Sequence, residues 1–229
     1  MNENIGILIP AYNEEKTIGG IVRELKEIFS MVVVVDDGST DKTFLFALQN
    51  GAIVLKHKER SGKGKALQTG FSFLIKKNID FVLTMDADGQ HKVSDINNFI
   101  VAAKRSPDID IWIGKRKIKG SNMPFVRRLT NISMSLLISL LSLQYIPDTQ
   151  SGFRLIKDSV LKNQKFSSSY FEMESELLIK SSLLKGAKIG SVLIETVYEK
   201  QKSKINPIED TFRFFKMLFF IIFDSWKKN

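Results

Sequence analysis

The chain has 229 residues, of which 43% are hydrophobic and 26% charged, and its formal net charge is +9. This length and composition exclude an intrinsically disordered chain and indicate one sizeable folded unit. The excess of Lys and Arg favours an anionic partner, such as nucleic acid, a phosphorylated substrate or an anionic membrane surface.

Strand-like and helix-like segments alternate through the first half. Apolar runs predict strands at 5–10, 32–35, 52–55, 81–85 and 109–114. Apolar residues at spacings of three and four predict helices at 18–29, 62–77 and 95–104, and we expect Ser39 or Thr40 to cap a further helix. This alternation predicts an α/β fold with a mostly parallel central sheet flanked by helices.

The second half is more apolar, and basic residues flank its apolar segments. We expect a helix at 171–184, a strand within 188–197 and a last helix with Asn206 as its cap and Pro207 as its first residue. Segment 129–143 fits either the protein core or a membrane interface. The aromatic segment 212–226, which ends in lysines, favours a helix lying in the membrane interface.

The sequence also limits where the protein is found. It contains no cysteine, which excludes disulfides and thiolate metal sites. Its N-terminus has no signal-peptide pattern, and no uninterrupted apolar run reaches the ~18 residues of a membrane-spanning helix. We therefore expect a cytoplasmic location.

Acidic turns follow three of the predicted strands. They are Pro10-Ala11-Tyr12-Asn13-Glu14, Asp36-Asp37-Gly38-Ser39 and Asp86-Ala87-Asp88-Gly89-Gln90-His91. Because the carboxyl ends of parallel strands meet at one edge, where open α/β sheets bind ligands, we expect one shared site. The oxygen ligands of Asp86 and Asp88 suit a divalent cation shared with a diphosphate. For any one turn by itself, the alternative is a simple helix cap.

Five motifs in order resemble the family 2 glycosyltransferases, and among them the dolichyl- or polyprenyl-phosphate mannosyl- and glucosyltransferases. The motifs are Pro10 to Glu14, Asp36 to Thr43, Gly62-Lys63-Gly64-Lys65-Ala66, Met85 to His91 and Ser151-Gly152-Phe153-Arg154. The resemblance implies a GT-A-type nucleotide-sugar-binding fold. It also implies inverting, metal-dependent transfer of a sugar from a donor of the GDP-mannose or UDP-glucose type.

The resemblance assigns roles residue by residue. Pro10, Tyr12, Glu14 and Asp37 would surround the nucleotide, and Lys63 and Arg154 would lie near the donor. Apart from the resemblance, Lys202 and Lys204 would clamp the diphosphate of the donor over the closed site. Asp86, Asp88 and Gln90 match the site for Mg²⁺ or Mn²⁺ and the diphosphate. Arg116, Arg127 and Arg128 fall where acceptor-phosphate arginines are expected, and with Asp88 they would form the catalytic set. The late basic loop at 198–204 departs from the family pattern, because lysines stand where relatives often carry arginine and glycine.

The resemblance covers roughly residues 4 to 210, and because the sequence has no internal repeat or linker-like stretch, we expect a single glycosyltransferase domain at 1–229. Its nucleotide-sugar half would be 1–115, its acceptor half 116–205 and its membrane-interfacial helix 206–229. The expected acceptor is polyprenyl or dolichyl phosphate at the cytoplasmic membrane face, reached by peripheral membrane contact, with or without a membrane protein as partner.

Two alternatives remain open at this point. A lipid phosphate is already ionised and needs no strong general base. His91 could serve as a base, but it is one of only two histidines, and we expect it to be structural or to support a neighbouring site residue. A saccharide acceptor in cell-envelope polysaccharide synthesis would instead need a base such as Glu172 or Glu174. A basic nucleic-acid-binding protein is a third possibility. We expect no nucleic-acid partner, because acidic residues interrupt the positive charge of the first half.

Overall fold

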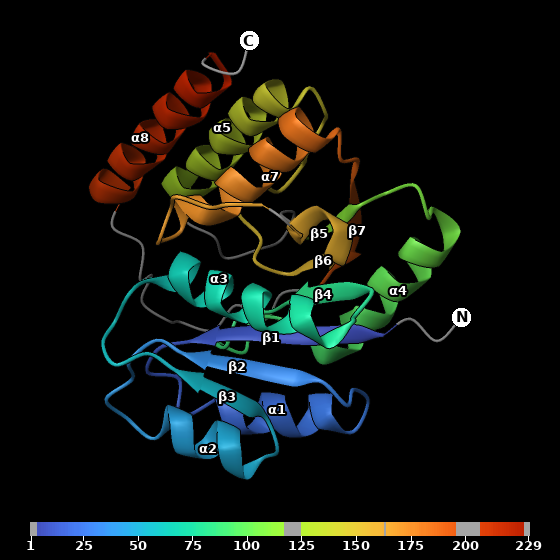
Figure 1. Cartoon of the computed structure of the whole chain (residues 1–229), viewed down its shortest axis with the longest axis vertical. Coiled ribbons are helices and arrows are strands. Elements are labelled where there is room, and N and C mark those ends of the chain that lie inside the picture. Colours follow the sequence, from blue (N-terminus) through green and yellow to red (C-terminus); the bar gives the residue numbers. More distant parts are fainter. Residues whose placement is uncertain (1–3, 117–124, 163, 196–206, 227–229) are drawn as a thin grey trace.

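The computed structural model describes residues 4–116, 125–162, 164–195 and 207–226, and it is built on one seven-stranded sheet (Figure 1). The strands are β1 (Ile5–Ala11), β2 (Val32–Asp36), β3 (Ile53–Lys56), β4 (Phe81–Thr84), β5 (Ile111–Arg116), β6 (Arg154–Lys157) and β7 (Ile189–Ile194). Their order is β3-β2-β1-β4-β6-β5-β7. Strand β6 runs antiparallel to β4 and β5, and the other neighbouring strands are parallel. The prediction of a mostly parallel sheet is confirmed.

Helices cover both faces of this sheet. They are α1 (Ile18–Lys26), α2 (Thr43–Gln49), α3 (Lys63–Leu74), α4 (Ile96–Arg105), α5 (Phe125–Ser142), α6 (Asp158–Leu161), α7 (Glu172–Lys185) and α8 (Pro207–Trp226). Short 3₁₀ turns at Ile75–Lys77 and Val93–Asp95 adjoin α3 and α4. The core on one face includes α1, α2 and α4, and the core on the other includes α3, α5, α7 and α8. Strands β1 and β2 are buried along their whole length, which explains their continuous apolar sequences.

Two local features differ from the sequence-based expectation. Strand β6 was not predicted, because four residues give little pattern and the strand is held by pairing with β4 and β5 on its two sides. The prediction that Ser39 or Thr40 caps α2 is wrong. Asp41 Oδ1 accepts a hydrogen bond from Thr43 N (2.9 Å), whereas Ser39 Oγ accepts one from Asn13 N (2.9 Å) in the loop after β1.

Two further expectations concern the second half. Pro207 is the first residue of α8, as predicted, but its expected cap Asn206 lies outside the described residues, as does the 198–204 loop. None of the helices in the described part of the chain combines the length and apolar character that crossing a membrane requires.

Glu176 fastens the segment before α7 to that helix. Its side chain is fully buried, and its carboxylate accepts hydrogen bonds from Ser167 N, Ser167 Oγ and Ser168 N at 2.8–3.1 Å. Lys180, one turn further along α7, adds an ion pair. Because α7 begins directly after this segment, Glu176 sets where the first turn of α7 lies.

We expect Glu176→Ala to lower the free energy of unfolding by about 3 kcal/mol near neutral pH, because the Ser168 N–H and the Lys180 ammonium, both largely buried, lose their partner. Burial raises the pKa of Glu176, but hydrogen bonds from Lys180, Ser167 and Ser168 outweigh burial and hold the pKa below its ordinary value. A lowered folded pKa gives stability that is present above the unfolded pKa of about 4.3 and is lost as the pH falls through the folded pKa. Urea unfolding measured from neutral to acidic pH should show that the difference in free energy of unfolding between wild type and Glu176→Ala becomes smaller in acid. A gap independent of pH would contradict this account.

Candidate active site

The three acidic turns meet at the carboxyl edge of the sheet. Strands β2, β1 and β4 are neighbours and parallel, so the turn after each opens on the same edge. Tyr12 directly follows β1, Asp36 ends β2, and Asp86 comes two residues after β4. The strand order reverses between β1 and β4, which is the kind of position where open α/β sheets bind ligands.

The second half of the chain adds two elements to this edge. Arg116 is the last residue of β5, and β6 begins at Arg154 and runs in the opposite direction, so the 151–153 turn lies at the same edge. A Cβ atom on Gly152 would lie 2.8 Å from both carboxylate oxygens of Asp86 and from Lys63 Nζ. The antiparallel strand therefore brings the S-G-F-R motif against the Asp86 turn, and only glycine leaves room there.

Lys63 connects the Asp86 turn to α7. Its Nζ lies 2.7 Å from Asp86 Oδ1 and 2.9 Å from Glu174 Oε2. Burial raises the pKa of Asp86, but the Lys63 charge outweighs burial and brings that pKa down to about 2. Burial lowers the pKa of Lys63, but Asp86 and Glu174 outweigh burial and raise it above its ordinary value. The Asp86 carboxylate and the Lys63 ammonium are therefore both charged near neutral pH.

Asp88 is the second acid of the turn, and His91 supports the turn from behind. Asp88 Oδ1 accepts a hydrogen bond from Gln90 N (3.0 Å), and burial followed by the charge of Asp86 raises the pKa of Asp88. His91 stacks on Phe153 with ring centroids 4.8 Å apart, and its Nδ1 accepts a hydrogen bond from Asp86 N (3.3 Å). Burial lowers the pKa of His91, so the ring is neutral, and this geometry supports the structural role expected for it.

The donor groups of the turn fit a divalent cation. The described residues contain no group of three or more His, Cys, Asp or Glu side chains arranged to hold a metal. Mg²⁺, however, is commonly held by one or two carboxylates together with water and substrate phosphates. Asp86 and Asp88 supply two such carboxylates, and burial, followed by the charge of Asp86, raises the pKa of Asp88. These residues suit Mg²⁺ or Mn²⁺ bound together with a diphosphate.

Asp37 holds the loop after β3 in place. Its buried carboxylate accepts hydrogen bonds from Ser61 N (2.9 Å) and Gly62 N (2.7 Å) and lies 2.7 Å from His57 Nδ1. The residue expected to contact the nucleotide thus shapes the 57–62 loop beside the site. Sequence analysis missed His57. Its place directly after β3, at the same edge of the sheet, was the available signal.

Tyr12 is the aromatic residue at this edge. The Arg60 guanidinium carbon lies 4.5 Å from the centre of the Tyr12 ring, within the range of a cation–π contact. Pro10 lies buried within β1, and Glu14 N donates a hydrogen bond to Thr43 Oγ1 (2.7 Å). Of the residues expected around the nucleotide, Tyr12 is therefore the one with an aromatic ring.

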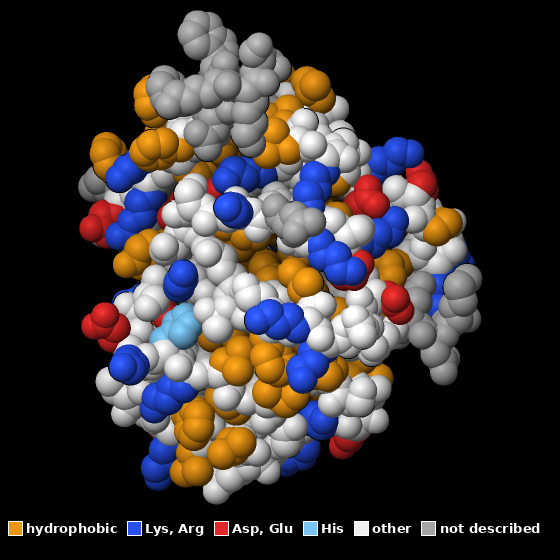
Figure 2. All heavy atoms as spheres, in the orientation of Figure 1, with side chains coloured by type: hydrophobic (Ala, Val, Ile, Leu, Met, Phe, Trp, Pro, Cys, Tyr) orange, Lys and Arg blue, Asp and Glu red, His pale blue; other side chains and the backbone are white. Residues whose placement is uncertain are grey.

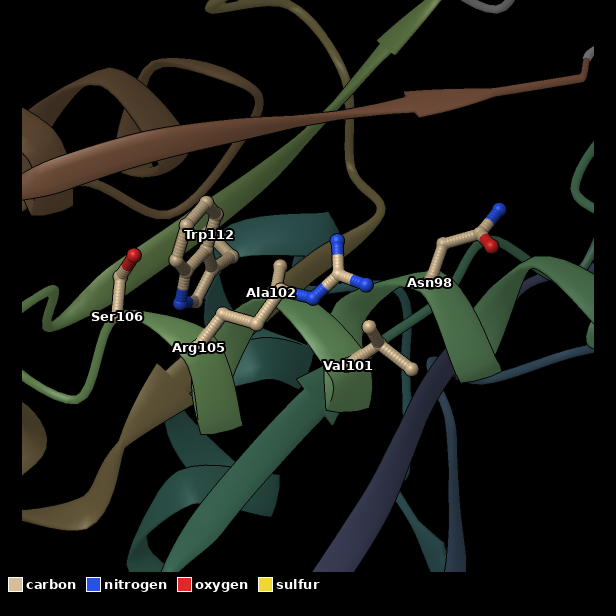
Figure 3. A pocket seen from close by; sticks show the side chains of 6 residues that line it. All are labelled: Asn98, Val101, Ala102, Arg105, Ser106 and Trp112. Atoms are coloured by element: carbon tan, nitrogen blue, oxygen red, sulfur yellow. The ribbon is translucent and has the colours of Figure 1, made fainter.

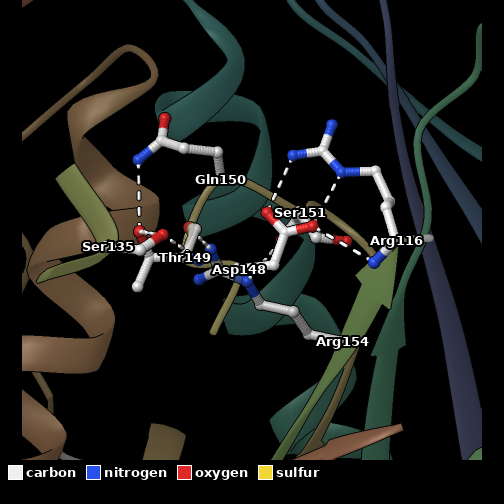
Figure 4. Close-up of polar contacts among 7 residues, drawn as sticks. All are labelled: Arg116, Ser135, Asp148, Thr149, Gln150, Ser151 and Arg154. Atoms are coloured by element: carbon white, nitrogen blue, oxygen red, sulfur yellow. Dashed lines mark hydrogen bonds and ion pairs between the residues drawn. The ribbon is translucent and has the colours of Figure 1, made fainter. Parts of the chain in front are cut away.

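Arg116 is held by an acid that sequence analysis did not single out (Figure 4). Its Nε and Nη2 each donate to the Asp148 carboxylate at 2.8 Å, and its backbone N donates to Asp148 Oδ2 at 3.2 Å. Ser135 Oγ on α5 accepts a hydrogen bond from Thr149 N (3.1 Å) and so fixes the same turn. An acid three residues before Ser151 of the S-G-F-R motif was the available signal for Asp148.

Arg154 is buried against backbone beside the acidic edge. Only 1% of it is exposed, and its guanidinium donates to the backbone carbonyls of Ser151 (2.8 Å), Thr149 (2.8 Å) and Glu174 (2.7 Å). Its guanidinium is therefore engaged by backbone, and the expectation that Arg154 lies near the donor stays a prediction. Through these hydrogen bonds Arg154 ties the 148–151 turn, drawn in Figure 4, to Glu174 of α7.

Three expected site residues cannot be assessed in the same way. Arg127 and Arg128 lie on α5, but the structure does not describe their side chains. Lys204 lies outside the described residues. Their roles stay predictions.

A surface pocket between α4 and β5 lies apart from this edge (Figure 3). It is lined by Asn98, Val101, Ala102, Arg105, Ser106 and Trp112. Trp112 is the second residue of β5, whereas Arg116 ends the strand at the carboxyl edge. This pocket is therefore separate from the acidic turns.

Comparison with known proteins identifies the family. Residues 6–164 match the model of glycosyl transferase family 2. The chain belongs to this family. It is 32% identical to the UDP-N-acetylglucosamine–dolichyl-phosphate N-acetylglucosaminyltransferase of Methanococcus voltae, over 85% of this chain and 86% of that relative. It is 30% identical to the dolichol-phosphate mannosyltransferase of Pyrococcus furiosus, over 81% of this chain and 55% of that relative.

A solved structure confirms the fold. Glucosyl-3-phosphoglycerate synthase from Mycobacterium tuberculosis, crystallised with Mn²⁺ and UDP-glucose, superposes with a TM-score of 0.71 at 21% identity. The match covers 88% of this chain and 73% of that one. The fold is that of the GT-A glycosyltransferases, as the sequence resemblance implied.

We expect Gly152→Ala to reduce sugar transfer about 10²-fold, because its methyl group would displace Asp86 and Lys63 by a fraction of an ångström or more. The variant should keep the wild-type circular dichroism spectrum. Gly20→Ala is the matched control, since no atom lies within 4 Å of the added Cβ and its activity should not change. Steady-state transfer assays measure the effect. Wild-type kcat/KM in a folded Gly152→Ala protein would refute the importance of this close approach.

Proposed function

We propose that this glycosyltransferase transfers one sugar from a nucleoside diphosphate donor to polyprenyl or dolichyl phosphate, with inversion at the anomeric carbon. The observation that carries the proposal is the arrangement at the sheet edge. The acidic pair Asp86 and Asp88 suits a divalent cation bound to a diphosphate. The positively charged side chains of Lys63 and Arg116 suit phosphate oxygens. Such a combination recognises the parts common to every nucleotide sugar, whatever the sugar is.

The acceptor is inferred from the relatives. The proteins of Methanococcus voltae and Pyrococcus furiosus are named for different sugars, N-acetylglucosamine and mannose, but both names specify a dolichol-based lipid phosphate. A dolichyl-phosphate hexose transferase of Haloferax volcanii is a third such relative, 26% identical over 90% of this chain and 88% of its own length. The shared acceptor favours a lipid phosphate here and leaves the sugar open.

The chain's own residues fit this chemistry. A divalent cation bound by Asp86 and Asp88 would offset the negative charge that develops on the leaving diphosphate. The Tyr12 face would stack on the base, and the 57–62 loop held by Asp37 would form the wall of the nucleotide site. The acceptor phosphate oxygen would form the new bond to the anomeric carbon as the bond to the diphosphate breaks. Since that oxygen is already ionised, no residue needs to remove a proton.

Arg116 is the described residue best placed to orient the acceptor phosphate. It ends β5 at the site edge, and Asp148 holds its guanidinium plane through two hydrogen bonds. An arginine held in this way keeps its fixed geometry for phosphate and loses little side-chain freedom on binding. Arg127 and Arg128 of α5 are proposed to complete the acceptor site.

The structure weakens the case for a saccharide acceptor. Glu174 is engaged by Lys63 at 2.9 Å. Glu172 is buried, with Tyr170 N donating to its Oε1 (3.3 Å) and its Oε2 without a hydrogen-bond partner among the described residues. Glu174 is therefore not presented as a ready general base. The saccharide acceptor stays an outcome of the test below.

A donor and acceptor screen tests the proposal. Purified protein with Mg²⁺ or Mn²⁺ would receive UDP-N-acetylglucosamine, GDP-mannose or UDP-glucose, with short polyprenyl phosphate or the unphosphorylated prenol. We expect lipid-linked sugar only from the phosphorylated acceptor, and Asp88→Asn to lower its formation at least about 10²-fold. Asp108→Asn, which changes an exposed acid, should leave activity unchanged. Nucleotide release without lipid product would favour a saccharide acceptor, and absence of metal-dependent nucleotide binding would overturn the proposal.

We also propose that α5 and α8 rest on the cytoplasmic face of the membrane. Both helices pack against α7 on one side of the sheet. Their outer faces expose large apolar side chains, visible over α8 at the upper left of Figure 2: Leu136, Leu140, Leu143 and Tyr145 at α5, and Phe212, Phe215, Phe219 and Phe220 on α8. Exposed apolar surface of this kind on helices with basic residues suits an anionic lipid interface.

The start of α8 also lies close to the candidate site. The Arg213 guanidinium carbon lies 4.0 Å from the centre of the Tyr170 ring. A Cβ atom on Gly62, the residue before Lys63, would lie 2.8 Å from that ring. A lipid phosphate held near α8 would therefore be near the Lys63 turn.

We expect the double variant Phe212→Ser and Phe215→Ser to bind anionic lipid vesicles at least about tenfold more weakly, because each phenyl ring loses its burial in lipid. Co-sedimentation with phosphatidylglycerol-containing vesicles measures binding. The paired change Leu45→Ser and Leu48→Ser removes similarly exposed apolar side chains from α2, on the other face of the sheet, and should have no effect. Equal loss in both double variants would argue against a specific role for α8.

A further inference from the structure

A lysine ammonium lies at the carboxylate that is expected to bind the divalent cation. Lys63 Nζ is 2.7 Å from Asp86 Oδ1 and 2.9 Å from Glu174 Oε2. The Glu174 side chain is 12% exposed and that of Lys63 18%. One largely buried ammonium is therefore shared between the turn after β4 and the first turn of α7.

The backbone around Lys63 explains this placement. Gly62 has φ 101°, and Cβ atoms on Gly62 and Gly64 would lie 2.4 Å from Ser169 O and 2.6 Å from Tyr170 O. Lys65 N also donates to Ser169 O (2.9 Å). The start of α3 is thus fixed against the residues that lead into α7, which brings Lys63 to Glu174.

We propose that Lys63 and Glu174 form an exchangeable counter-ion pair that sets the affinity of Asp86 for a divalent cation. Without nucleotide, the Lys63 ammonium neutralises Asp86. When the cation and diphosphate bind, the ammonium gives up Asp86 and stays with Glu174, so neither charge is left buried and unpaired. This inference rests on the proposed metal-assisted donor site.

Glu174 acts in this scheme as a positioning residue. If Glu174 were neutral, the Lys63 ammonium would keep its ion pair with Asp86. It would then compete more strongly with the divalent cation for the Asp86 carboxylate. With Lys63 neutral, the cation would meet no competitor at Asp86. The two residues should therefore shift metal affinity in opposite directions, and the effect of Glu174 should depend on the presence of Lys63.

The test is titration of the full chain with Mn²⁺, following free Mn²⁺ by electron paramagnetic resonance, with and without UDP or GDP. We expect Lys63→Met to bind Mn²⁺ about tenfold more tightly without nucleotide and Glu174→Gln to bind it about tenfold more weakly with nucleotide. In the Lys63→Met background, Glu174→Gln should change the affinity little. Lys65→Met removes an exposed charge two residues away and should behave as wild type.

The outcomes separate this inference from the proposed function. If the wild type binds Mn²⁺ with nucleotide but Lys63→Met leaves the affinity unchanged, the exchange is wrong and the donor site stands. Equal weakening by Glu174→Gln in both backgrounds would also overturn the exchange, since Glu174 would then act through its own charge. If the wild type binds no Mn²⁺ with either nucleotide, both proposals fail. Thermal unfolding of each variant confirms folding, and Lys63→Gln replaces Lys63→Met if that variant is unstable.

Discussion

The pairing of buried charges at the carboxyl edge constrains the rest of the site. A carboxylate removed from water needs a cation or hydrogen-bond donors, because an unpaired buried charge costs several kcal/mol. Asp86 has Lys63, Asp148 has Arg116, and Asp37 has the backbone N–H groups of the 57–62 loop. These partners come from separate segments of the chain. Apolar packing holds the sheet together, and charge pairing determines how the loops at its carboxyl edge approach one another.

Glycine makes this pairing sterically possible. Gly152 lies against the Asp86–Lys63 ion pair, and Gly62 and Gly64 let the start of α3 touch the backbone before α7. Each position would clash if it carried even one methyl group. Glycine at these three positions lets the chain segments approach closely. The charged side chains that the segments carry can then form ion pairs.

The sequence predicted the elements of the first half and the three acidic turns, because strand period, helix period and strand-end chemistry are local signals. It missed β6, whose four residues become a strand through pairing on two sides. It missed Asp148 and His57, whose partners lie 32 and 20 residues away in the chain. It did not show that the Arg154 guanidinium faces backbone carbonyls, because a motif identifies a residue type and tertiary burial decides what that residue faces.

The state of the titratable groups bears on which acceptor the site can use. A hydroxyl acceptor must lose a proton as it attacks, so it needs a base that is free to take one. At this edge Glu174 pairs with Lys63, Asp148 pairs with Arg116, and His91 is stacked on Phe153 with its Nδ1 accepting a backbone hydrogen bond. Freeing any of these groups would leave a buried partner unsatisfied. A phosphate acceptor makes no such demand, because it arrives ionised and needs only to be held. The same charge pairing that stabilises the site thus favours a phosphate over a sugar hydroxyl as the nucleophile.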